Sequence, residues 1–180
     1  MKNRRMNLPL SRGTWTLARY LSTHSPAPMP SVALAGDDLL HVAKLAIASS
    51  VPRAVYVVDD EHRYLGVITE VRLAREVFAH LDPSLYLGEH ARAATRLLHL
   101  GRDVSQLPAR SLIETQRQSL RGRQTLTDAL AALYQAEVDE LPVVNHDGQL
   151  LGVIRALDIV REWVEDLLLT QLGDETGSFY

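Results

Sequence analysis

Residues 138–158 read VDELPVVNHDGQLLGVIRALD, and this stretch decides the fold. Two short apolar runs, residues 141–144 and 150–154, flank the polar sequence Asn-His-Asp-Gly. Glycine tolerates the positive φ angle that a tight turn requires, so this spacing predicts a β-hairpin. Asp158 follows where a helical pattern begins, and a carboxylate there favours the helix dipole and can face a ligand. The stretch therefore predicts a hairpin that leads directly into a helix.

The same pattern occurs a second time, 86 residues earlier. Placing Gly66 on Gly152 aligns LGVI at residues 65–68 with LGVI at residues 151–154, and Val-Val at residues 57–58 with Val-Val at residues 143–144. Upstream, the two helical patterns also align without a gap. Each unit is too small to bury its own sheet, so we expect two repeats packed face to face with pseudo-twofold symmetry.

Periodicity and turn signals also predict the elements around the hairpins. The first helix begins at Asp37 or Asp38 and ends before Ser49, with Leu40 and Ile47 on its apolar face. Residues 14–21 are interpreted as a short helix or strand, and the prolines of residues 25–30 as an extended linker. The remaining predictions are strands at residues 54–58, 64–68 and 111–113, and helices at residues 70–81, 85–100, 125–136 and 156–172.

Composition narrows the class of protein. Hydrophobic residues make up 46% of the chain and charged residues 23%, which is ordinary for a soluble globular protein. The chain has no cysteine, which excludes disulfides, thiolate metal sites and a cysteine nucleophile. No apolar run approaches the ~18 residues needed to span a bilayer, and the N-terminus lacks a signal-peptide core. We therefore expect a soluble cytoplasmic protein with no membrane span.

Charge is unevenly distributed along the chain. Residues 1–36 contain five Lys or Arg and no acid, whereas the whole chain has a net charge of −3, so the remainder carries −8. Such a basic arm can bind nucleic acid, an anionic membrane or an acidic partner. A solvated tail that touches its own acidic body is the simpler interpretation, and nucleic acid is not the expected partner.

Both repeats resemble a known protein family. LPVVNHDGQLLGVIRALDIV in the second repeat is similar to the CBS motif, named after cystathionine β-synthase, and AVYVVDDEHRYLGVITEVRLAREV in the first is a looser match. The tandem pair resembles a Bateman module. The resemblance implies an α/β (more strictly α+β) fold of two β-α-β-β-α repeats. It assigns a basic arm and linker to residues 1–30, the repeats to 31–82 and 107–165, a connecting helix to 83–106, and the helix end and tail to 166–180.

The resemblance also implies a binding site for an adenosine ligand such as AMP, ADP, ATP or S-adenosylmethionine in clefts between the repeats. The family motif places Ser or Thr after the Gly and two apolar residues, and Asp three positions further. Here the first repeat has Thr69 but Arg72, and the second has Arg155 but Asp158. The residues expected to contact nucleotide by resemblance are Thr69, Arg72, Ile154, Arg155 and Asp158, with backbone at Arg53, Ala54, Leu141 and Pro142.

These departures from the motif leave two interpretations of the second repeat open. Arg155 and Asp158 can serve phosphate and ribose respectively, because guanidinium matches phosphate geometry and a carboxylate accepts hydrogen bonds from both ribose hydroxyls. Alternatively, the two side chains neutralise each other at a helix start and no nucleotide binds. In the first repeat, Arg72 makes the site poor for ribose but attractive to an anion.

Catalysis has little support in the sequence. None of the seven histidines forms the i, i+4 pair of a helical metal site, and no phosphate loop, nucleophile elbow or dinucleotide glycine pattern occurs. We therefore expect a protein that is not an enzyme and has no metal site or required cofactor. The resemblance implies a regulatory nucleotide-binding homodimer. Because no output domain flanks the repeats, we expect it to signal to a separate effector, or else to be a structural interaction protein with vestigial clefts.

Overall fold

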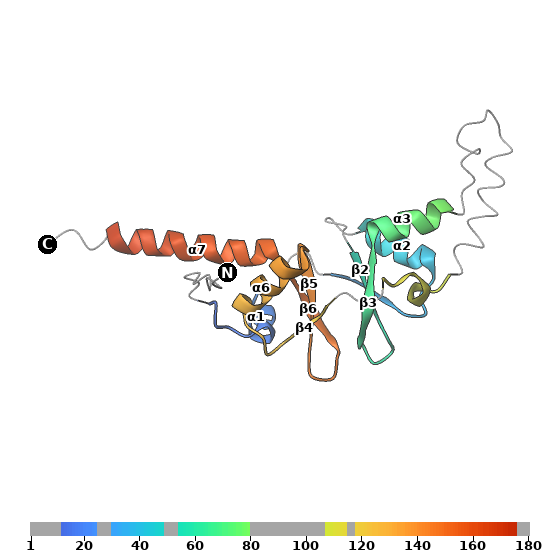
Figure 1. Ribbon diagram of the computed structural model, residues 1–180, viewed down its shortest axis with the longest axis horizontal. Coiled ribbons are helices and arrows are strands. Elements are labelled where there is room, and N and C mark those ends of the chain that lie inside the picture. Colours follow the sequence, from blue (N-terminus) through green and yellow to red (C-terminus); the bar gives the residue numbers. More distant parts are fainter. Residues whose placement is uncertain (1–11, 25–29, 49–53, 80–106, 115–117, 176–180) are drawn as a thin grey trace, which may run out of the picture. The chain divides into compact units, whose positions relative to one another are not determined.

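The computed structural model describes residues 12–24, 30–48, 54–79, 107–114 and 118–175 (Figure 1). The chain divides into two compact units. The first-repeat unit comprises residues 28–117 with 148–150, and the second-repeat unit comprises residues 1–27, 118–147 and 151–180. Each unit holds one three-stranded sheet accompanied by helices, which confirms the predicted mixed α/β class.

The first-repeat unit is built on the sheet β1-β2-β3. Its elements are β1 (Ser31–Leu34), α2 (Leu39–Ala48), β2 (Ala54–Val58), β3 (Tyr64–Thr69), α3 (Glu70–Ala79) and the 3₁₀ helix η1 (Ala109–Leu112). Strand β1 runs parallel to β2, and β3 runs antiparallel to it. The buried apolar core joins the sheet to α2 and η1 through Ala33, Leu39, Val42, Val55, Val57, Ile68, Ala109 and Leu112.

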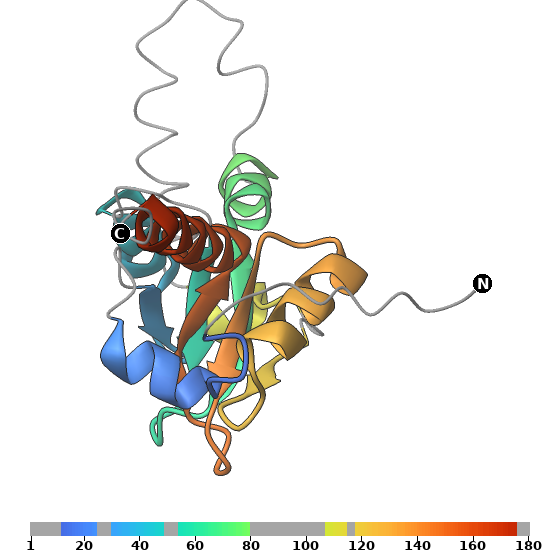
Figure 2. The same cartoon turned by 90° about the vertical axis from the view of Figure 1, so that its left-hand side faces the viewer.

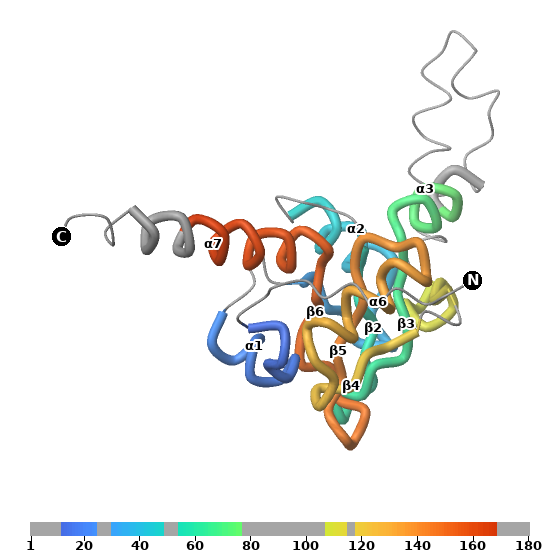
Figure 3. The backbone as a smooth tube through the Cα atoms, turned by 60° about the vertical axis from the view of Figure 1, so that its left-hand side comes forward, coloured from blue at the N-terminus to red at the C-terminus, as the bar shows by residue number. Residues whose placement is uncertain are grey.

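The second-repeat unit is built on the sheet β4-β5-β6. Its elements are α1 (Leu17–Thr23), β4 (Leu120–Arg121), α6 (Leu126–Ala136), β5 (Glu140–Val144), β6 (Leu150–Arg155) and α7 (Ala156–Glu175). Strand β4 runs parallel to β5, as β1 does to β2. Figure 3 follows the chain from β6 directly into the long helix α7.

The duplication predicted from the sequence is visible strand by strand. Strands β2 and β5 share one pattern of burial, with an intermediate first residue and four buried ones. Strands β3 and β6 share another, in which the three buried residues include Gly66 and Gly152 respectively. Apolar residues buried on both faces of a strand explain why these runs are continuous and not alternating.

The two hairpin turns place different residues in the same left-handed backbone conformation. Gly148 has a φ of +83°, in the left-handed region that glycine adopts at little cost. His62 stands at the equivalent position of the first repeat and has a φ of +61°. A side chain in this region costs about 1 kcal/mol or more, so the first hairpin is the more strained of the two.

The helix starts follow the capping residues in the sequence. The side chain of Thr125 accepts a hydrogen bond from the backbone N–H of Asp128, whose carboxylate accepts one from the Thr125 N–H, so a capping box opens α6. Of the two acids before α2, Asp38 accepts from the backbone N–H of His41 at 2.7 Å. Asp37 instead accepts from the N–H of Leu34 at 2.7 Å.

Some local predictions were wrong. Residues 111–113 do not form a strand, because the backbone N–H groups of Ala109 and Arg110 donate to Asp37 and Ala35 and fold the segment into η1. Leu40 and Ile47 are exposed, at 51% and 82%, because only part of the α2 surface meets the sheet. Strands β1 and β4 were not located from the sequence, since they have four and two residues. The predicted helix at residues 85–100 lies outside the described residues.

The segment preceding the first strand of each sheet contributes core residues to the other unit. Leu17 and Tyr20 of α1 are buried in the second-repeat unit, although β1 follows them in the chain. Residues Ala109 and Leu112, which precede β4, are buried in the first-repeat unit. Figure 2 shows α1 beside the strands of the second repeat. A segment assigned from the sequence to an arm and linker thus contributes core residues.

Two glycines at equivalent positions of the repeats allow these segments to pack closely on the last strand of each sheet. A Cβ added at Gly152 would lie 3.2 Å from Cδ1 of Leu21 in α1, and one added at Gly66 would collide with Cγ2 of Ile113, just after η1. In both units the preceding segment therefore rests directly on the backbone of the last strand. This close approach explains why glycine recurs at this position of the repeat.

Candidate functional site

Arg155 and Asp158 meet at the junction between β6 and α7. The Asp158 carboxylate accepts hydrogen bonds from Nε and Nη2 of Arg155 at 3.1 and 3.2 Å, and from the Arg155 backbone N–H at 3.1 Å. The Asp158 side chain is only 6% exposed and that of Arg155 is 20% exposed. The contact is a bidentate, charge-assisted pair, which is a strong form of ion pair. The neutralised arrangement foreseen from the sequence is therefore the one in the structure.

The other residues expected at this site lie on the two neighbouring strands. Ile154 ends the buried part of β6, and Leu141 and Pro142 lie near the start of β5. The backbone N–H of Ala156 donates to the carbonyl of Asp139 at 2.8 Å, which ties the helix start to the start of β5. Ile154 and Leu141 are buried, so neither side chain is available to a ligand in this arrangement.

The corresponding junction of the first repeat is arranged differently. The Thr69 hydroxyl donates to Oε1 of Glu114 at 2.8 Å and accepts from the backbone N–H of Arg72 at 3.1 Å. The Arg72 guanidinium instead lies 3.4 Å from Glu76, one turn further along α3. Ala54 is paired with Thr69 across β2 and β3. Arg53 lies outside the described residues.

Glu114 was not anticipated as a site residue. It lies between η1 and β4, yet it contacts the first-repeat junction. A carboxylate beside Thr69 adds negative charge where the motif places a hydroxyl for phosphate or ribose. Nothing in the sequence around Glu114 marks it, because its partner is 45 positions away.

A second group of polar side chains lies one turn along α7 from Asp158. Glu162 is buried, with only 3% of its side chain exposed, and Oε2 accepts a hydrogen bond from Arg12 at 2.6 Å. His24 Nε2 lies 3.2 Å from the same guanidinium, and its ring stacks on Tyr20 with centroids 4.8 Å apart. The N-terminal segment is therefore held to α7 by charge as well as by apolar packing. The i, i+4 spacing from Asp158 was the only sequence signal for Glu162.

Tyr20 makes this group sensitive to alkaline pH. Burial raises the pKa of Tyr20 above its ordinary value, and the nearby charges of Glu162 and Asp158 raise it further. Above the ordinary value of 10.0, the unfolded chain releases this proton while the folded protein retains it. Stability should be complete below that pH and then fall by about 1.4 kcal/mol per pH unit until the folded tyrosine ionises.

The Tyr20→Phe variant should lose this component of the pH dependence. Urea titrations across the alkaline range would measure the slope, with Tyr134→Phe as the matched control because Tyr134 is 78% exposed. The two variants should differ in slope above the ordinary tyrosine pKa. Equal slopes would show that Tyr20 ionises as freely as a surface tyrosine.

The structure offers no centre for metal chemistry within the ranges it describes. No group of three or more His, Asp or Glu side chains there is placed to hold a metal ion. His146 pairs with the neighbouring Asp147 at 3.0 Å, and His41 lies 3.7 Å from Asp37. His80, His90 and His99 lie outside the described residues. Among the described residues, no helix has the length and apolar character to cross a membrane.

Comparison with solved structures shows the same fold in other proteins. CbpB in complex with c-di-AMP is 18% identical, with a TM-score of 0.63 over 91% of this chain and 92% of that one. CBSX2 from Arabidopsis thaliana is 20% identical, with a TM-score of 0.57 over 87% and 96%. CBSX2 in complex with AMP is 19% identical, with a TM-score of 0.57 over 83% and 96%. At these identities the likeness shows the fold alone.

Comparison of sequences places the duplication in a family. No curated protein matched the sequence. The model of the CBS domain matches twice, at residues 28–79 and 104–165, which together make up more than half of the chain. These matches cover both strand–helix junctions and the glycine in each last strand. The chain therefore belongs to the CBS domain family and contains a tandem pair of these domains.

Proposed function

We propose that this protein is a non-catalytic regulatory module that binds an adenosine nucleotide of the AMP, ADP or ATP type. The tandem CBS pair supports this proposal, as do the fold neighbours CBSX2 and CbpB, which form complexes with AMP and c-di-AMP. The nucleotide is a regulatory ligand in this proposal and not a cofactor of any reaction.

The observation that carries the proposal is the Arg155–Asp158 pair at the start of α7. A buried carboxylate and a partly exposed guanidinium lie in direct contact, at the end of β6 and beside the backbone of β5. Arginine binds phosphate oxygens in a bidentate manner, and a carboxylate can accept hydrogen bonds from both ribose hydroxyls. The positive end of the helix dipole adds to the attraction for phosphate.

Binding requires the ion pair to open partially. The Arg155 guanidinium has to exchange its two contacts with Asp158 for phosphate oxygens, which conserves the number of charge-assisted hydrogen bonds. The backbone N–H of Arg155 can remain on Oδ2 of Asp158, because that contact is part of the helix start. The exchange replaces one anion by another at the guanidinium, so its cost is smaller than that of leaving a buried charge without a partner.

The first repeat is the weaker site in this proposal. Glu114 presents a carboxylate to Thr69, and Arg72 already lies beside Glu76. A phosphate approaching Thr69 meets like charge, and no aspartate is present to receive ribose. We place the higher-affinity nucleotide site in the second repeat.

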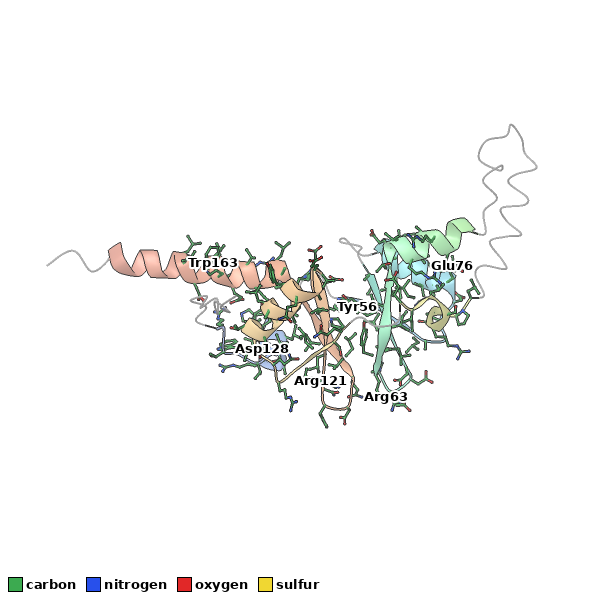
Figure 4. All side chains as sticks on the ribbon, in the orientation of Figure 1. Tyr56, Arg63, Glu76, Arg121, Asp128 and Trp163 are labelled. Carbon is green, nitrogen blue, oxygen red and sulfur yellow. The ribbon has the colours of Figure 1, made fainter. Side chains whose placement is uncertain are left out.

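In this proposal the protein forms a homodimer and signals nucleotide occupancy to a separate effector. The free face of α7 carries exposed apolar side chains at helical spacing, and Figure 4 shows Trp163 on this helix. These side chains are Leu157, Val160, Trp163, Val164, Leu167 and Leu168, each at least 37% exposed. Because Asp158 lies in the first turn of α7, a ligand there that favours one arrangement of the helix shifts the binding equilibrium between α7 and its partner.

The Arg155–Asp158 ion pair also supports an alternative function, in which no nucleotide binds. If Arg155 and Asp158 stabilise each other too well to open, the site is vestigial and the protein acts only in dimerisation and docking. The two functions differ in one measurable property, which is nucleotide affinity.

Thermal unfolding in the presence of nucleotides tests the proposal. Ligand at a hundred times its dissociation constant adds about 2.7 kcal/mol to stability, which for a chain of this size raises the melting temperature by roughly 5–10 °C. AMP, ADP or ATP should produce this shift, and inosine monophosphate should produce less if the adenine edge is read by backbone. Absence of a shift with all three adenosine nucleotides at millimolar concentration would favour the vestigial alternative.

A further inference from the structure

The second-repeat unit contains a pocket at the opposite end of β6 from Asp158. It has a volume of about 500 Å³ and lies among the N-terminal end of α1, the turn after β4 and the turn between β5 and β6. Small-molecule sites in proteins have volumes of about 300–1,000 Å³. Leu151 lines the pocket, and four residues of extended strand, about 13 Å, separate Leu151 from Arg155. The pocket is therefore distinct from the proposed nucleotide site.

Backbone hydrogen bonds hold the walls of this pocket in place. The N–H of Ala18 donates to the carbonyl of Gly122 at 2.9 Å, and the N–H of Gly122 donates to the carbonyl of Val144 at 2.8 Å. The side chain of Arg121 donates to the carbonyl of Asn145 at 3.3 Å. A Cβ at Gly122 would lie 2.9 Å from Leu151 Cδ1 and 3.2 Å from Ala18 Cβ, so these walls meet closely at Gly122. The pocket is pre-formed and does not depend on a loop closing.

Two arginine side chains give the lining of the pocket a positive charge. Arg121 and Arg123 both line it, and within the described part of the chain neither guanidinium has a carboxylate within 4 Å. Figure 4 shows Arg121 near the β5–β6 turn. His146 also lines the pocket and is paired with Asp147. Two guanidinium groups that lack a carboxylate partner, both beside one pocket, attract an anion.

We propose that this pocket binds a small organic phosphate. The phosphate group meets the Arg121 and Arg123 guanidinium groups, whose planar donor geometry matches phosphate oxygens. The organic part lies against Ala18 and the Leu151 side chain, which is 42% exposed and supplies the apolar surface. Inorganic phosphate can make the same contacts with the arginines but has no apolar group to contact Ala18 and Leu151. The affinities of the two ligands therefore distinguish an organic phosphate site from a site for inorganic phosphate.

Calorimetric titration of the full chain with phenyl phosphate and with inorganic phosphate tests this assignment. Phenyl phosphate should bind, and more tightly than inorganic phosphate. Arg121→Gln and Arg123→Gln should each weaken phenyl phosphate binding about tenfold or more, because each removes a charged hydrogen-bond donor. Arg110→Gln is the matched control, since Arg110 is an exposed arginine of the first-repeat unit and its loss changes net charge equally.

Conservative and pocket-filling variants show whether a loss of phosphate binding comes from lost contacts in the pocket, from misfolding or from the change in net charge. Arg121→Lys and Arg123→Lys keep the charge but lose the planar fork, so they should retain folding and still weaken binding. Ala18→Phe should fill the apolar side, and it should abolish the advantage of phenyl phosphate over inorganic phosphate while leaving the latter bound. Equal losses in Arg110→Gln and Arg121→Gln would show only a nonspecific charge effect and would overturn the proposal.

Backbone amide signals locate the bound probe. In an NMR titration with phenyl phosphate, the amides of Ala18 and Gly122 should shift and that of Asp158 should not. A shift at Asp158 alone would assign the binding to the proposed nucleotide site and reject this pocket. No binding of phenyl phosphate at millimolar concentration would reject the pocket and leave the nucleotide proposal unaffected.

Discussion

Replacing Leu17 by alanine is expected to lower the free energy of unfolding of the second-repeat unit by about 2–5 kcal/mol. Leu17 is fully buried in the core that also contains Leu126, Leu141 and Ile154. Truncation removes its transfer free energy from water and leaves a cavity between α1 and the sheet. An effect of this size from a residue upstream of both repeats would show that the N-terminal segment is part of the second domain.

Tryptophan fluorescence can follow this unit by itself. The sequence has two tryptophans, Trp15 and Trp163, and both belong to the second-repeat unit. Urea titrations read by fluorescence should therefore detect the loss. Leu157→Ala is the matched control, because Leu157 is 67% exposed on α7 and its truncation should cost about 0.5 kcal/mol or less. Similar costs for the two variants would mean that α1 is not packed as described.

The second large effect concerns ligand binding. The Asp158→Asn variant is expected to weaken adenosine nucleotide binding by about tenfold to a hundredfold, the usual range for losing hydrogen bonds to a charged group. Asparagine is nearly isosteric and still accepts from the Arg155 N–H, so the helix start should persist. Its neutral amide loses the charge that receives ribose and that balances Arg155.

Asp128→Asn provides a control of the same kind. Asp128 lies in the first turn of α6, in the same unit, and its carboxylate has a capping role without a proposed ligand. Both variants should lose some stability, whereas only Asp158→Asn should lose nucleotide affinity. If Asp128→Asn weakened nucleotide binding equally, the effect of Asp158 would be attributable to helix stability and not to contact with ribose.

Local patterns in the sequence predicted much of this fold. The strands β2 and β5 and the Gly148 turn were foreseen, because each depends on neighbours within a few positions. The repeat offset was foreseen because LGVI and Val-Val recur at the same spacing. The resemblance to CBS domains is confirmed by the family matches. The placement of α1 was not foreseen, since no local signal tells Leu17 which of two similar units it will join.

The site was partly predictable for the same reason. Arg155 and Asp158 are three positions apart, so their contact was one of the two interpretations open from the sequence. Glu114 and Glu162 became visible only in the structure, because their partners Thr69 and Arg12 are 45 and 150 positions away. The contact of a nucleotide with the β5 backbone stays a prediction, whereas the carboxylate beside Thr69 had no counterpart in the motif.

Calorimetric titration of the wild-type protein with AMP and with ATP is the most direct test of nucleotide binding in the second repeat. The account predicts saturable binding of at least one of these nucleotides, with one high-affinity site per chain, because the first repeat lacks the ribose-binding aspartate and carries Glu114. Titrations of AMP and ATP that release no heat at several temperatures, with no adenosine nucleotide copurifying with the protein, would contradict the account.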